Sequence, residues 1–124
     1  MKLARLLVLL SAIALFLGGI AHTFGYTKIS TILAGSTLSP KIADALRCVW
    51  LVFTAEAVLL APALVWISRR PGTRSLLLYL ALIPVVDAVL MYHFVGFFIG
   101  FYIVSASALL LLAGAWQLPR NQGV

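Results

Sequence analysis

The sequence predicts an all-α integral membrane protein, a four-helix bundle with both termini in the cytoplasm. Three observations lead to this prediction. Of the 124 residues, 64% are hydrophobic and only 10% are charged, whereas a soluble domain has about 45–50% apolar and about 25% charged residues. The apolar residues fall into four stretches of about 20, the length of a helix that crosses the hydrocarbon core. Basic residues stand at the ends of these stretches. A water-soluble enzyme, a nucleic-acid-binding protein and a disordered chain are therefore excluded.

The four spans expected in this single transmembrane domain cover residues 3–25, 43–68, 75–94 and 98–117. The first begins with Lys2 and Arg5 and continues as an apolar run that only Ser11 interrupts. A basic start followed by an apolar run is also typical of a cleavable signal peptide. Because three remaining spans would make a thin bundle, we expect the first one to stay in place.

A loop rich in Thr, Ser and Gly is expected over residues 26–39. Ser39 and Pro40 then have the character of an N-cap and a first helical residue. The second helix should therefore begin near Pro40 and continue to the basic turn at 69–74, longer than the membrane requires. Pro62 in its interior should kink it.

The third and fourth spans are bounded by the basic turn, by a reversal at Gly96–Gly100 and by Pro119. Pro84 lies inside the third span, where proline removes a helical hydrogen bond. Near its start, the second helix carries Asp44 and Arg47, whose i, i+3 spacing predicts an ion pair on one helix face.

The distribution of basic residues predicts the orientation. With both termini inside, six basic residues face the cytoplasm and three face outward, and cytoplasmic loops normally carry the excess. The six are Lys2, Arg5, Arg69, Arg70, Arg74 and Arg120, and the three are Lys28, Lys41 and Arg47. We therefore expect a multi-pass protein of the plasma (inner) membrane and not a dual-topology dimer.

Two acidic residues inside the spans indicate a site, because ionisable groups are costly within a membrane. Glu56 is thirteen residues before Arg69, and Asp87 is thirteen residues after Arg74. At the helical rise both lie about 20 Å above the turn, at one height on neighbouring antiparallel helices. If they face each other, they cannot both ionise cheaply, so one should hold a proton. We predict Glu56 and Asp87 as an acid/base pair.

Further polar side chains from all four helices are expected in the same outer half of the bundle. His22 joins Glu56 and Asp87 as a candidate catalytic residue, in a strip of small residues that lets another helix approach closely. The candidate ligand-binding residues are Trp50, Thr54, His93, Tyr102 and Ser107. The inner half is almost entirely apolar, which favours a crevice open to the outer leaflet.

The leading hypothesis is a pocket that binds a small lipophilic molecule, with isomerase- or hydrolase-like acid/base conversion as an extension of it. The alternatives are a proton-coupled small transporter using Glu56 and a non-catalytic membrane subunit. A haem b held by His22 and His93 is a minor alternative, since paired imidazoles are good axial ligands. No metal-binding motif is present. Membrane lipid is an expected partner, nucleic acid is not, and a homo-oligomer is compatible with the sequence.

Overall fold

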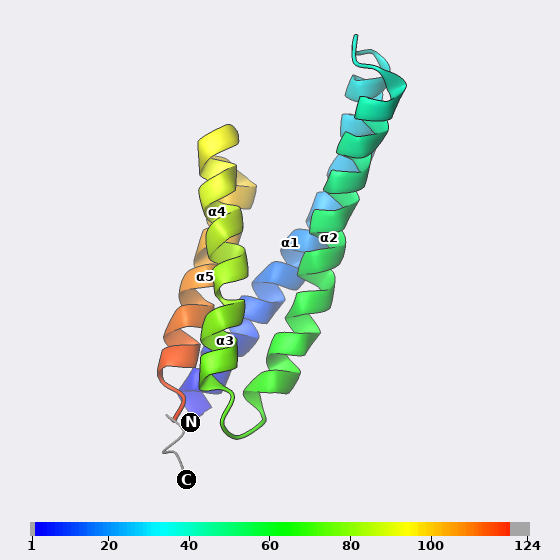
Figure 1. The fold of residues 1–124 in the computed structure, drawn as a ribbon. Helices are drawn as coiled ribbons and strands as arrows, with labels where there is room; N and C mark the ends of the chain where they lie inside the picture. Colours follow the sequence, from blue (N-terminus) through cyan, green and yellow to red (C-terminus); the bar gives the residue numbers. More distant parts are fainter. Residues whose placement is uncertain (1, 120–124) are drawn as a thin grey trace.

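The computed structural model describes residues 2–119 and is helical throughout, with no strand in that range (Figure 1). The elements are α1 (Lys2–Ala34), α2 (Pro40–Ser68), α3 (Arg74–Leu80), α4 (Leu82–Phe94) and α5 (Ile99–Trp116). With α3 and α4 taken as one span, four helices are long and apolar enough to cross a membrane. Large hydrophobic side chains are exposed along their length, as expected where lipid replaces water.

The first helix is longer than the sequence predicts. The expected loop over 26–39 is wrong, because α1 continues to Ala34. The hydroxyls of Thr27 and Thr31 donate to the carbonyls of Phe24 and Thr27 at 3.3 and 2.9 Å. These side chains therefore bond within the helix, where the composition had suggested a loop. At 1.5 Å per residue α1 is roughly 50 Å long, well beyond a hydrocarbon core of about 30 Å.

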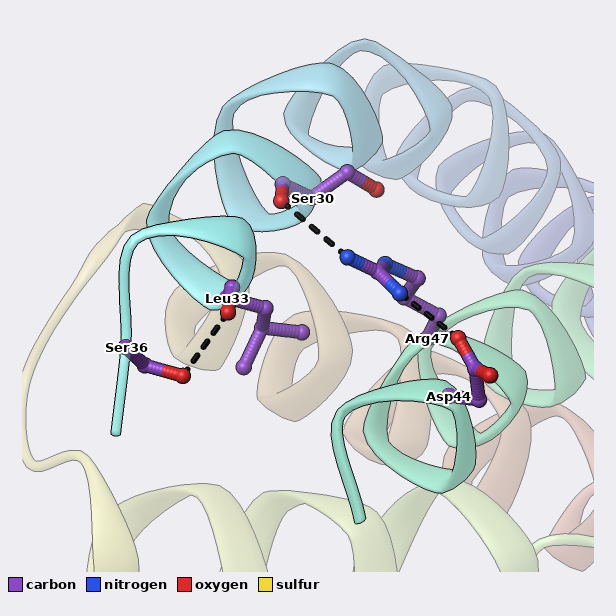
Figure 2. Close-up of polar contacts among 5 residues, drawn as sticks. All are labelled: Ser30, Leu33, Ser36, Asp44 and Arg47. Carbon is purple, nitrogen blue, oxygen red and sulfur yellow. Dashed lines mark hydrogen bonds and ion pairs between the residues drawn. The ribbon is translucent and has the colours of Figure 1, made fainter. Parts of the chain in front are cut away.

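The extra length of α1 packs beside the start of α2, and together residues 26–48 form what we call the distal hairpin. Figure 1 shows α1 and α2 side by side, extending past the ends of α4 and α5. Arg47 links the two helices: Nη1 donates to Asp44 Oδ1 at 2.6 Å, and Nη2 donates to the Ser30 carbonyl at 3.4 Å (Figure 2). The predicted pair of Asp44 and Arg47 is thus present, with a bond to α1 in addition.

The two prolines within spans have different effects. α2 begins at Pro40, with Ser39 as its N-cap residue, and passes Pro62 without interruption. The third span is instead divided at Ala81, so that α3 ends four residues before Pro84. Proline has no N–H to donate to the carbonyl four residues earlier and its ring crowds that carbonyl, which accounts for the break. The reversal before α5 has Gly96 at a φ of +83°, a conformation that suits glycine.

The helices form two arms joined at one end. α1 packs along both α2 and α5, whereas α4 packs along α5 and not along α2. We call the end that carries Lys2, the α2–α3 turn and the end of α5 the basic end. A close-packed apolar core lies near it. Its fully buried members include Ala4, Val8, Leu64, Leu77 and Leu111. Away from this core the α1–α2 arm diverges from the α3–α4–α5 arm (Figure 1).

Candidate functional site

A cavity of about 370 Å³ lies where the two arms diverge, with walls from α1, α2, α4 and α5. This volume is within the range of small-molecule sites, about 300–1,000 Å³. The lining side chains are apolar apart from His22 and the indole of Trp50. The residues around it include Leu15, Gly18, Gly19, His22, Trp50, Phe53, Ala57, Met91, Phe98, Ile103 and Val104. The cavity thus offers an apolar wall with one imidazole.

His22 is held by an aromatic stack between α1 and α2. Its ring lies over Trp50 with the centroids 4.0 Å apart and the planes 15° apart, and Phe53 is tilted against it at 4.9 Å. Trp50 Nε1 donates to the His22 carbonyl at 3.0 Å. Because ring and backbone of His22 are both held by one indole, the position of this histidine is fixed by α2.

Thr54 completes the arrangement one turn after Trp50. Its Oγ1 is 2.9 Å from His22 Nδ1 and also donates to the Trp50 carbonyl at 3.3 Å. Three of the eight residues that the sequence predicts for the site, His22, Trp50 and Thr54, are therefore brought together. The spacing of Trp50 and Thr54 by four residues places them on one helix face.

Two glycines of α1 make this close packing possible. A Cβ at Gly25 would lie 2.7 Å from Trp50 Cζ2, and a Cβ at Gly19 would lie 3.0 Å from the Ala57 Cβ. Any larger residue at Gly25 would displace the indole. The small-residue strip predicted around His22 therefore receives α2, as such strips do in membrane helix pairs.

Ser107 lies between the cavity and the basic end and is not part of the cavity wall. It is fully buried against Ser11, and each hydroxyl donates to the other residue's carbonyl, at 2.8 Å from Ser11 and 3.1 Å from Ser107. The hydroxyl oxygens are themselves 2.8 Å apart. One helical turn above, Leu15 and Val104 line the cavity. The serine pair thus joins α1 to α5 at the closed side of the site.

Glu56 and Asp87 lie beside the cavity, outside its lining. Both are half-buried, and their carboxyl groups are near enough to interact electrostatically. No basic side chain within residues 2–119 forms an ion pair with either. Glu56 stands between the lining residues Phe53 and Ala57, and Asp87 is one helical turn before a further lining residue, Met91. The pair therefore borders the site from α2 and α4.

His93 and Tyr102 lie outside the cavity and are both exposed. His93 meets the edge of Phe94, with ring centroids 4.7 Å apart, and Tyr102 stacks on Phe97 at 6.3 Å. His22 is half-buried in the cavity wall while His93 is exposed outside it, so this geometry lends no support to a haem held between them. Across residues 2–119 no three metal-ligating side chains gather.

Several residues of the site were not predicted from the sequence. Phe53, Met91 and Ile103 line the cavity, yet each is an ordinary apolar residue of a membrane helix. The position of Phe53, three residues after Trp50, was an available signal because such residues share a helix face. In comparisons with known proteins, no family model, curated protein or solved structure matches this chain.

Proposed function

We propose that this protein binds a small lipophilic molecule in the cavity between its two arms. The observation that supports the proposal is the cavity itself: a space of about 370 Å³, almost wholly apolar, with one fixed imidazole in its wall. An apolar site with few, well-placed polar groups is the usual form of a small-molecule site. The apolar outer surface of the helices would give such a ligand access through the lipid.

The orientation that we propose places the basic end in the cytoplasm and the cavity in the outer half of the plasma membrane. Five of the six basic residues that favour it are described, while Arg120 lies outside residues 2–119. At the basic end Arg70 and Arg74 lie over the rings of Trp66 and Trp116, 4.8 and 4.7 Å from the ring centroids. Tryptophan and arginine together are typical of a membrane–water interface.

The chain's single cysteine, Cys48, tests this orientation, because it is exposed at the end of the distal hairpin. A membrane-impermeant maleimide added to intact cells should label Cys48. The matched control is the double variant Cys48→Ser with Arg70→Cys, whose only cysteine lies in the α2–α3 turn. This cysteine should react only after the cells are permeabilised. If the maleimide labelled the Arg70→Cys control in intact cells and did not label Cys48, the protein would have the opposite orientation.

A second candidate function, acid/base conversion of the bound molecule, is favoured by the carboxylate pair. Glu56 on α2 and Asp87 on α4 are near enough for their charges to influence each other, and they have no basic ion-pair partner within residues 2–119. A pair that shares one proton can deliver and accept it, which is what general acid/base catalysis requires. Both groups border the cavity, and a ligand seated there would be their neighbour.

The packed core at the basic end weighs against a transporter. A transport path needs polar groups or water on both sides of its site. Between the cavity and the basic end lie the serine pair and a core made of Ala, Val and Leu side chains. This arrangement fits a site that is closed on the cytoplasmic side.

Occupancy of the cavity is tested with 1-bromo-4-octylbenzene, whose bromine quenches nearby tryptophan. Trp50 is left as the sole tryptophan by Trp66→Phe and Trp116→Phe, both far from the cavity. Quenching in nanodiscs should contain a saturable component. The double variant Met91→Phe with Ile103→Phe, which fills the cavity from two lining positions, should abolish this saturable component. The matched control, Val89→Phe with Leu109→Phe, changes two exposed residues of the same helices and should keep the saturable component. Linear quenching, equal in all three proteins, would refute the proposal.

A further inference from the structure

We propose that the cavity recognises lipophilic molecules that carry a hydroxyl group, an alcohol or a phenol, whose O–H donates to Nε2 of His22. This inference rests on the proposed binding function and adds the chemical class of the ligand. It follows from the hydrogen bonds around His22, which determine which ring nitrogen carries the proton.

Thr54 sets the tautomer of His22. A threonine hydroxyl has one proton and can accept through its lone pairs, and we assign this proton to the Trp50 carbonyl, which can only accept and lies 3.3 Å away. The oxygen is then an acceptor for its other neighbour, His22 Nδ1, at 2.9 Å. In a neutral imidazole one nitrogen donates and the other accepts. With the proton on Nδ1, Nε2 carries a free lone pair.

His22 Nε2 has no hydrogen-bond partner among residues 2–119, while its ring lines the cavity. The plane of the ring is also restrained, because Trp50 covers one face and Phe53 contacts it from the side. Nε2 is thus a fixed acceptor in an otherwise apolar space. An acceptor in such a place is satisfied by a ligand that brings a single donor.

The size and lining of the cavity define the rest of the ligand. About 370 Å³ of apolar space accommodates a ring or a branched chain, and Trp50, Phe53 and Phe98 provide flat walls against which a ring packs. Glu56 and Asp87 are outside the lining, so the ligand needs no cationic group. A monohydroxylated lipophile therefore fits the site better than an amine or an anion.

Three probes of nearly equal shape test this inference: 4-octylphenol, its methyl ether 4-octylanisole, and 4-octyltoluene. Each competes with 1-bromo-4-octylbenzene for the protein in which Trp50 is the sole tryptophan. The phenol should bind about 2- to 10-fold more tightly than the other two, the range expected for one net hydrogen bond. The ether and the hydrocarbon should be equal, because neither has an O–H.

Two variants separate this interaction from general lipophilicity. His22→Phe keeps an aromatic ring against Trp50 but has no acceptor, so all three probes should bind equally to it. Thr54→Val removes the hydroxyl that sets the tautomer and should weaken the preference for the phenol, whereas Thr54→Ser should restore it. Thr54 is a positioning residue, and its role has a spectroscopic signature. In protein labelled with ¹⁵N-histidine, Nδ1 of His22 should be the protonated nitrogen in the wild type and lose that preference in Thr54→Val.

The outcomes distinguish this inference from the function on which it rests. Equal binding of phenol and hydrocarbon by the wild type would overturn the hydroxyl specificity and leave a lipophilic site. Equal binding of phenol and ether, both above the hydrocarbon, would overturn it as well, because Nε2 would then be the donor. Protonated Nε2 in the wild-type spectrum would have the same meaning. Absence of saturable binding by every probe would overturn the proposed function itself.

Discussion

Replacing Gly25 with alanine should disturb the site through one contact, that of its new Cβ with the Trp50 ring. The Cβ would lie 2.7 Å from Cζ2 of that ring, well inside van der Waals contact. The indole is rigid, and it is already held between the His22 ring and the His22 carbonyl. It must therefore move as a whole, and the stack and the hydrogen bond move with it.

The expected magnitude follows from these opposing effects. Overpacking in a close-packed region costs about 1–3 kcal/mol. Alanine is a better helix former than glycine by about 1 kcal/mol, which offsets part of that cost. Gly25→Ala should therefore lower the free energy of unfolding by up to about 2 kcal/mol, measured by titration with denaturing detergent from mixed micelles. Tryptophan emission should shift in the protein where Trp50 is the sole tryptophan.

A double-mutant cycle identifies the cause. Trp50→Phe removes the part of the ring that a Cβ at Gly25 would meet, so adding Gly25→Ala to Trp50→Phe should be neutral or stabilising. The coupling between the two positions should thus be at least about 1 kcal/mol, within the range for residues in contact. Gly35→Ala is a further control, because a Cβ there would lie 3.9 Å from its nearest neighbours. If Gly25→Ala had the same effect with and without the indole, the steric argument would be refuted.

Three further predictions concern the rest of the structure. Ser11→Ala and Ser107→Ala each leave one hydroxyl-to-carbonyl bond between α1 and α5, so each should cost about 0.5–1 kcal/mol in the detergent titration; a double variant as stable as the wild type would contradict this. An infrared band of a protonated carboxyl group should be present at neutral pH and absent from Glu56→Gln with Asp87→Asn, since two neighbouring carboxylates in apolar surroundings do not both ionise. If the band is absent from the wild type, the two groups do not share a proton. Arg47→Ala should speed amide hydrogen exchange in the distal hairpin and leave α5 unchanged, and equal exchange in both would show that the Arg47 bridge does not hold the hairpin.

The sequence predicted the helices better than their ends. Four apolar runs and their basic boundaries were sufficient to place the four helices that are long and apolar enough to cross a membrane, and the Ser39–Pro40 pair marked the start of α2 at the right residue. The helical extension of α1 to Ala34 was missed because Thr and Ser are typical of loops in isolation. Within α1 their hydroxyls bond to backbone carbonyls one turn earlier, and the neighbouring α2 supports the extension. Such support is a tertiary effect that composition does not contain.

For the site, counting residues along the helices predicted how far each side chain lies from the basic turn, but not which side of its helix it occupies. Counting residues from the basic turn placed Glu56 and Asp87 at one level, and both lie next to residues that line the cavity. The same counting placed His93 and Tyr102 at the level of His22, yet both are exposed. A residue's rotation about the helix axis depends on which neighbours the helix packs against. Here α4 packs on α5 and not on α2, an arrangement that the sequence does not reveal.

The position of the cavity follows from the way α1 serves both arms. Gly19 and Gly25 let α2 approach one side of α1, and a Cβ at Gly18 would lie only 3.1 Å from Ile103 of α5 on another side. Two helices can therefore pack closely on α1, while α4 packs mainly along α5. The gap between α2 and α4 is thus a result of helix arrangement and not of missing side-chain volume. A ligand there would bridge two arms that are otherwise joined only through α1 and near the basic end. Its binding would add contacts between α2 and α4, so it should stabilise the folded protein by an amount that increases with ligand concentration.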